Sequence, residues 1–149
     1  MSEECLDARF AFAADLIDEA GALALGFFGH RETLHITSKG RQDMASEADV
    51  DTERLIRKRL AEHFPDDAFL GEETGRGEVE DAQGIWVVDP IDGTQPFVHG
   101  LTSWCVSIAY VRDGAVEMGF VNAPARDELF VGRRGEGATL NGAPITVSD

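Results

Sequence analysis

The sequence predicts an α+β fold in which N-terminal helices pack on a mainly antiparallel sheet. Apolar residues recur at helical spacing before residue 65, whereas short apolar runs separated by turn residues fill the last third of the chain. With 149 residues, 43% of them apolar, the chain is long enough to bury a core. We therefore expect a single domain over residues 1–149.

The first helix is predicted to end near residues 26–29, where two glycines fall. After it, residues 35–38 fit a short strand. Residues 39–43 are polar and contain a glycine, which favours a loop. The apolar positions that predict the first helix are Leu6, Phe10, Ala13, Ile17, Ala20, Ala24 and Phe28.

A second helix is expected to start at Ser46, whose hydroxyl can cap free backbone N–H groups, and to end before Pro65. Asp49 would then lie near its N-terminus, where the helix dipole favours an acid. Two short apolar runs follow. Residues 68–71 lead into Glu72 and residues 85–88 lead into Asp89, so two predicted buried strands each deliver a carboxylate at their end.

The last third predicts three further strands, over residues 106–111, 116–121 and 129–131. Turn residues separate them, at 113–114 and 123–127. Asn141-Gly142 predicts a later tight turn. These hairpins are the reason for expecting antiparallel pairing.

Acidic residues outnumber basic ones 28 to 13, and the formal net charge is -15. Such a surface disfavours nucleic acid and anionic membranes as partners. No apolar run reaches membrane-spanning length, and the first residues are acidic, so a cytoplasmic location is expected. Cys5 and Cys105 lack metal-ligand spacing and are read as reduced thiols, and the four histidines show no zinc pattern.

The most informative stretch is Trp86-Val-Val-Asp-Pro-Ile-Asp-Gly-Thr94. Asp89 ends an apolar run, and Asp92 follows in a turn, so both carboxylates can face one point. Gly93 permits close approach of a ligand, and Thr94 supplies a hydroxyl before residues that can open a helix. Two such carboxylates repel each other unless a cation joins them, and all-oxygen ligands select Mg²⁺, Mn²⁺ or Ca²⁺. Taken alone, the pattern also fits an ordinary turn.

The order of several motifs resembles the inositol monophosphatase family. Lys39 in a polar segment is followed by Ser-Glu-Ala-Asp49, by Gly-Glu-Glu at 71–73, and by the Asp-Pro-Ile-Asp-Gly-Thr block. The match continues through Phe-Val-His-Gly at 97–100 and Gly-Glu-Gly-Ala at 135–138. The resemblance runs over nearly the whole chain.

The resemblance implies a Mg²⁺ site formed by Glu72, Asp89, the carbonyl of Ile91, and Asp92. It also implies that Glu72, Thr94 and Asp49 orient and deprotonate an attacking water. The backbone N–H groups of Gly93 and Thr94 would bind the phosphate, with Asp92 and Lys39 placed near it as further substrate-binding residues. The implied partner is a small phosphomonoester, and a homodimer is expected.

Two departures from the family pattern limit what the resemblance implies. Gln95-Pro96 stands where Thr-Asn is frequent, which can alter substrate preference. The chain stops at Asp149, where the family continues into a second α/β domain that completes the metal site and selects the alcohol. The substrate is expected to be myo-inositol monophosphate. Histidinol phosphate, a nucleotide 3′-phosphate, or a truncated, non-catalytic metal-binding fragment remain as alternatives.

Overall fold

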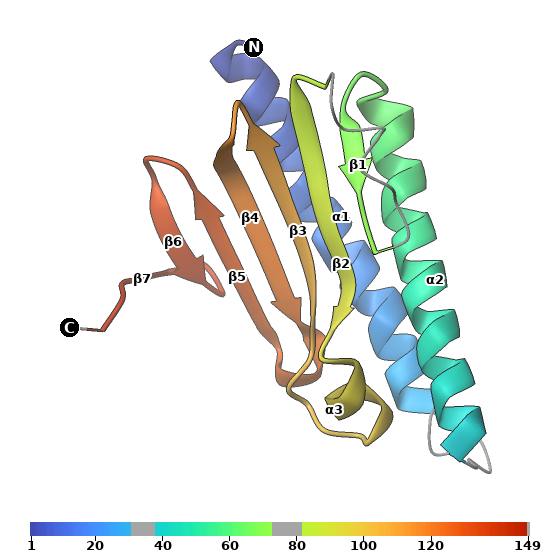
Figure 1. The fold of residues 1–149 in the computed structure, drawn as a ribbon. Helices are drawn as coiled ribbons and strands as arrows, with labels where there is room; N and C mark the ends of the chain where they lie inside the picture. Colours follow the sequence, from blue (N-terminus) through green and yellow to red (C-terminus); the bar gives the residue numbers. More distant parts are fainter. Residues whose placement is uncertain (31–37, 73–81, 149) are drawn as a thin grey trace.

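Two long helices cover one face of a seven-stranded sheet (Figure 1). The computed structural model describes residues 1–30, 38–72 and 82–148, with residues 38–46 described by their backbone alone. The helices are α1 (Glu3–His30) and α2 (Ser38–His63), which lie side by side behind the sheet. None of the helices in these ranges is long and apolar enough to cross a bilayer.

The strands follow one another across the sheet in chain order. The first two pair in parallel, and every later neighbour pairs antiparallel, which confirms the predicted fold class. A short helix, α3 (Thr94–Val98), follows β2, and a 3-10 turn, η2 (Pro124–Arg126), joins β4 to β5. The strands are β1 (Ala68–Leu70), β2 (Gly84–Asp92), β3 (Cys105–Arg112), β4 (Ala115–Ala123), β5 (Glu128–Arg133), β6 (Gly137–Leu140) and β7 (Ala143–Ile145).

Helix α1 confirms the first predicted helix and runs slightly beyond its expected end. Its buried positions repeat at intervals of three and four residues and so form one stripe that faces α2, β3 and β4. Acids fill the opposite, solvated side. The buried positions are Leu6, Ala13, Leu16, Ile17, Ala20, Gly21 and Ala24.

Helix α2 begins earlier than predicted. The expected loop over residues 39–43 and the expected start at Ser46 are both wrong, because the helix already begins at Ser38. Four of the residues from 41 to 45 (Arg, Gln, Met and Ala) favour helix strongly enough to offset one glycine. Asp49 therefore lies inside the helix rather than in its first turn. Of the strand expected over residues 35–38, residues 35–37 lie outside the described residues, and residue 38 is helical.

Strand β2 also differs from its prediction. Asp89 was expected to end the strand, but β2 continues to Asp92. Its register with β3 shifts between Asp89 and Asp92, where Pro90 stands. Proline has no N–H to donate to the ladder and is tolerated in sheets mainly at edges and bulges, so the strand bulges here and does not stop.

The predicted tight turns are confirmed. Asp113 and Gly114 have φ angles of 51° and 74°, and Asn141 and Gly142 have φ angles of 49° and 82°. Left-handed conformations at both central residues suit the two-residue hairpin turns that match strand twist.

The face of the sheet toward the helices carries the core. Side chains alternate along each strand, so every second residue points to this layer. The other face is not covered by a helix of the described residues, and Val87 there is 37% exposed. The largest fully buried side chains of the sheet are Trp86, Tyr110, Phe120, Ile91, Ile108 and Met118.

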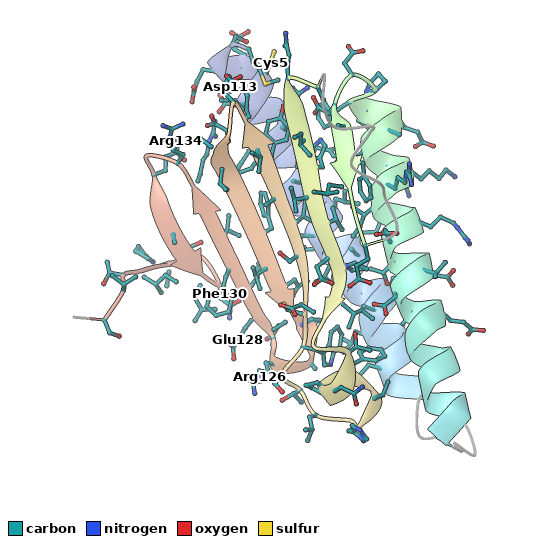
Figure 2. The ribbon with its side chains drawn as sticks, in the orientation of Figure 1. Cys5, Asp113, Arg126, Glu128, Phe130 and Arg134 are labelled. Atoms are coloured by element: carbon teal, nitrogen blue, oxygen red, sulfur yellow. The ribbon has the colours of Figure 1, made fainter. Side chains whose placement is uncertain are left out.

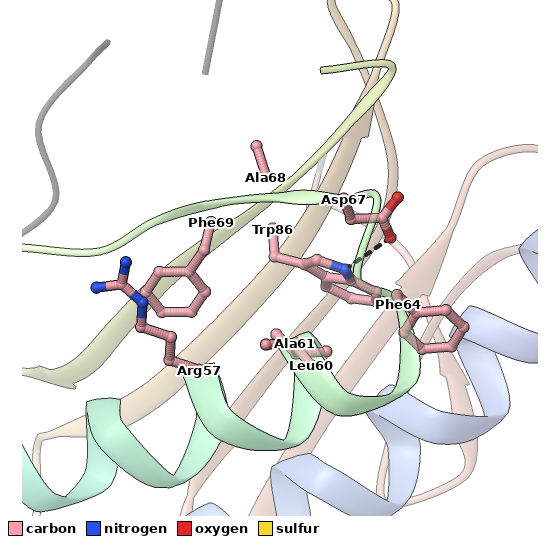
Figure 3. Close-up of a pocket in the computed structure, with 8 residues that line it drawn as sticks. All are labelled: Arg57, Leu60, Ala61, Phe64, Asp67, Ala68, Phe69 and Trp86. Carbon is pink, nitrogen blue, oxygen red and sulfur yellow. Dashed lines mark hydrogen bonds between the residues drawn. The ribbon is translucent and has the colours of Figure 1, made fainter. Parts of the chain in front are cut away.

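A buried polar network ties α1 to the start of β1. Asp67 forms two hydrogen bonds with Arg9, of 2.7 Å and 3.0 Å, and accepts a third from the indole N–H of Trp86 at 3.0 Å (Figure 3). The Tyr110 hydroxyl donates to the same carboxylate at 3.4 Å. The Asp67 side chain is only 3% exposed, so four donated bonds satisfy a charge that would otherwise be costly to bury.

Tyr110 provides a pH-dependent test of this network. Burial, followed by the negative charge of Asp67, raises the pKa of Tyr110 to about 12. Tyr110 is the sole tyrosine, so the phenolate absorbance of the folded chain is expected to titrate near pH 12, against about 10 after unfolding. The folded state then holds the proton more tightly, and the free energy of unfolding falls as the pH rises from 10 towards 12. A folded-state titration near 10 would contradict the packing described.

Candidate active site

The acidic residues predicted from the sequence gather where β1 and β2 end. These strands run in parallel, so their carboxyl ends lie at the same edge of the sheet. The last paired residues are Leu70 and Val87. Glu72 lies two residues after Leu70 and Asp89 two residues after Val87, so the register alone brings the two acids next to each other.

The electrostatics of Asp89 agree with this placement. Burial raises the pKa of Asp89, and the negative charge of Asp92 raises it further. A hydrogen bond from the Glu72 carboxyl and one from the backbone N–H of Ile91 act in the opposite direction. Asp89 therefore lies in contact with Glu72 and within the field of Asp92. Two carboxyl groups can share a hydrogen bond only when one holds a proton, which a nearby cation would replace.

The site chemistry fits a hard divalent cation. Oδ1 of Asp89 is buried and has no hydrogen-bond partner in the part of the chain that the structure describes, which leaves a desolvated carboxylate oxygen available to a ligand. Within the described ranges, however, no three acidic, His or Cys side chains already stand in a metal-binding group. Asp89 thus lies near Glu72 and near Asp92, but the three side chains do not yet surround one common point. The predicted ligands Glu72, Asp89 and Asp92 all offer oxygen atoms, the type that Mg²⁺ prefers.

Cys105 adjoins the acidic residues but was not predicted as part of the site. It pairs with Asp92 across the β2–β3 ladder. Burial, then the charges of Asp92 and Asp89, raise the pKa of the Cys105 thiol to about 11. The thiol therefore stays protonated near neutral pH and is a poor nucleophile. Both cysteines are free in the structure.

Helix α3 starts directly after the acidic bulge, as the sequence predicted. Thr94 is its first residue, and Gly93 precedes it with a left-handed φ of 94°. The helix has five residues, so its dipole contributes less than a long helix would. Phe97 anchors it in the core by packing edge-on against Trp104, with ring centroids 4.9 Å apart.

Gly93 is required both by its backbone conformation and by its neighbours. A Cβ at this position would lie 2.8 Å from the carbonyl oxygen of Ser103, whereas a Cβ at Gly114 would meet nothing within 4 Å. Both glycines have positive φ, which costs an L-residue about 1–2 kcal/mol. Gly93→Ala is expected to destabilise the chain by more than Gly114→Ala in urea unfolding. Equal losses would show that the contact with Ser103 is unimportant.

The other predicted site residues differ in what the structure shows. Ile91 is buried at 2% exposure, and its backbone N–H bonds to Asp89. Asp49 is half-buried on α2, four residues before Glu53 and therefore on the same side of the helix. The side chain of Lys39 and the whole of Glu73 lie outside the described residues.

Sequence reasoning missed Glu53. It is only 8% exposed, and its Oε1 accepts a hydrogen bond of 2.9 Å from the backbone N–H of Glu72. The spacing from Asp49 offers a weak signal, since the two acids share one face of α2. Acids on a predicted helix are usually solvated, so nothing in the sequence singles Glu53 out.

Comparison with known proteins agrees with the motif order. The sequence model of the inositol monophosphatase family matches residues 6–149. A histidinol-phosphatase from Chlorobaculum parvum is 41% identical over 141 residues, covering 91% of this chain and 52% of the relative. Inositol monophosphatase 1 from Solanum lycopersicum is 42% identical over 147 residues, covering 96% and 53%.

A solved structure shares the fold described above. The crystal structure of inositol monophosphatase II from Staphylococcus aureus superposes with a TM-score of 0.82 at 31% identity, covering 95% of this chain and 52% of that chain. The chain thus spans about half the length of the curated relatives it matches. With the family match extending over nearly all of its residues, the chain belongs to the inositol monophosphatase family.

Proposed function

We propose that the chain forms the metal- and phosphate-binding half of a Mg²⁺-dependent phosphomonoesterase. The parallel register of β1 and β2, which places Glu72 beside Asp89 and near Asp92, is the observation that carries the proposal. Glu72, Asp89, Asp92 and the carbonyl of Ile91 would hold the metal. When bound, Mg²⁺ neutralises phosphate charge, makes water a stronger acid and stabilises the leaving oxygen.

The protein groups supply orientation and proton transfer. Glu72 and Thr94, with Asp49 from α2, would orient the attacking water and accept its proton. The backbone N–H groups of Gly93 and Thr94 would bind the phosphate, with Asp92 and Lys39 near it. A metal at this edge also explains how a chain of net charge -15 can bind an anion.

The proposed substrate is myo-inositol monophosphate. The alternative is histidinol phosphate, because a relative named histidinol-phosphatase is about as similar as one named inositol monophosphatase. Release of inorganic phosphate from both compounds, and from a nucleotide 3′-phosphate, should be measured with and without Mg²⁺. The proposal expects Mg²⁺-dependent release that is fastest with inositol monophosphate. No release from any of the three contradicts it.

A non-catalytic, metal-binding role is the second candidate. Its supporting observation is the buried Oδ1 of Asp89, which has no hydrogen-bond partner among the described residues and would accept a cation whether or not a reaction follows. Titration calorimetry separates the two roles. Mg²⁺ binding without phosphate release indicates the binding module, and turnover excludes it.

We also propose that the chain forms a homodimer, for which light scattering should give twice the monomer mass.

A further inference from the structure

We propose that Glu53 is a positioning residue, which fixes the backbone where the chain leaves β1 and so orients the carboxylate of Glu72. The inference rests on the proposed function, because Glu72 is the metal ligand whose placement it explains. It gives a side chain on α2 an indirect role, in which it would act through Glu72.

The contact between Glu53 and Glu72 lies just beyond the strand pairing. The pairing of β1 with β2 ends at Leu70, two residues before Glu72. Oε1 of Glu53 accepts from the backbone N–H of Glu72 at 2.9 Å. A charged acceptor makes this bond stronger than one between neutral groups.

The burial of Glu53 makes the contact specific. The residue is 8% exposed, beside the fully buried Thr52 and Ile56 of the same helix face. A buried carboxylate without a partner is costly, so the donor from Glu72 stabilises Glu53 as well as being held by it. The two segments therefore fix each other.

Gly71 shows how closely the two segments approach. A Cβ at Gly71 would overlap Oε1 of Glu53 and would lie 2.7 Å from its Cδ. A side chain at Gly71 would thus push Glu53 away from the amide of Glu72. Gly71 therefore leaves the space that the Glu53 carboxylate needs to reach the Glu72 amide.

Orientation matters because Glu72 itself is exposed and lies outside any strand. A metal ligand whose backbone is not fixed loses more conformational entropy when it binds. Groups that orient metal ligands typically contribute roughly 10–100-fold to metal affinity or activity. Helix α2 also carries Asp49. The same rigid helix would therefore position Asp49 directly and Glu72 through Glu53.

The test compares Glu53→Ala, Glu53→Gln and Glu53→Asp, with Glu62→Ala as the control because Glu62 is an exposed acid on the same helix. Two quantities are measured on the full chain: amide hydrogen exchange at Glu72 by NMR, and Mg²⁺ affinity by calorimetry. Glu53→Gln keeps an acceptor oxygen at the same reach, whereas Glu53→Asp is shorter by one methylene.

The proposal predicts faster exchange at the Glu72 amide and roughly 10–100-fold weaker Mg²⁺ binding in Glu53→Ala and Glu53→Asp. Glu53→Gln should restore both, and Glu62→Ala should change neither. Wild-type amide protection and Mg²⁺ affinity in Glu53→Asp overturn the proposal. If Glu53→Ala does not fold, the comparison of Glu53→Asp with Glu53→Gln still tests the proposal.

Gly71→Ala gives an independent check. It should weaken Mg²⁺ binding in the wild-type background but much less in Glu53→Ala, where the overlap with Glu53 is gone and only Cε1 of Phe69, at 2.9 Å, stays close to the added Cβ. Additive effects count against the coupling. If the wild-type chain binds no Mg²⁺, the proposed function is contradicted. The role of Glu53 is still supported in that case if the Glu72 amide loses its protection in Glu53→Ala but keeps it in Glu53→Gln.

Discussion

Asp89→Asn is expected to lower Mg²⁺-dependent phosphate release by roughly 1,000-fold or more. The change keeps the shape of the side chain but removes the negative charge with which Asp89, together with Glu72 and Asp92, would hold the metal. Metal stabilisation of the transition state is worth several kcal/mol, and each 1.36 kcal/mol is tenfold in rate. Phosphate release at saturating substrate and Mg²⁺ provides the measurement.

Asp113→Asn is the matched control. Asp113 is exposed in the β3–β4 turn, at the opposite end of the sheet from α3 (Figure 2), and asparagine accepts its left-handed φ of 51° equally well. It removes the same charge without touching the site. Activity should be unchanged in Asp113→Asn. Equal losses in both variants, or no loss in Asp89→Asn, would exclude the proposed role of Asp89.

Asp67→Ala is expected to lower the free energy of unfolding by about 3–5 kcal/mol, because breaking a buried ion pair leaves its partner charge uncompensated. Here the partner is Arg9, whose side chain is 12% exposed. The N–H of Trp86 and the hydroxyl of Tyr110 lose an acceptor at the same time. Urea unfolding followed by tryptophan fluorescence measures the change.

Asp66→Ala separates this effect from a general effect of the turn. Asp66 is the preceding residue and is exposed, so its removal should change stability by no more than about 0.5 kcal/mol. A comparable loss in both variants would mean that the turn, rather than the buried network, carries the stability. The cavity next to this network, about 220 Å³ and lined by Phe64, Phe69 and Trp86, lies between α2 and β1 (Figure 3).

Much of the fold was predictable because its signals are local. The apolar period of α1 and the Asp-Gly and Asn-Gly turns each specify their own structure without help from distant residues. The two errors arose where local signals compete. Gly40 suggested a loop although its neighbours favour helix. The end of the apolar run before Asp89 suggested a strand end, although a bulge at Pro90 lets the strand continue.

The candidate site was predictable in part. Asp89 and Asp92 are close in sequence, and the parallel pairing of β1 with β2 brings Glu72 to the same edge. Glu53 was not predictable, because its importance depends on a contact across 19 residues with a backbone amide. The burial of Asp67 was not predictable either, because two adjacent aspartates in a turn normally indicate solvent exposure.

Anomalous diffraction from crystals of the chain grown with Mn²⁺ tests the central claim most directly. We predict a metal peak bounded by carboxylate oxygens of Glu72, Asp89 and Asp92, all within direct coordination distance of the ion. A fully occupied metal elsewhere on the chain, with these three side chains turned apart, contradicts it.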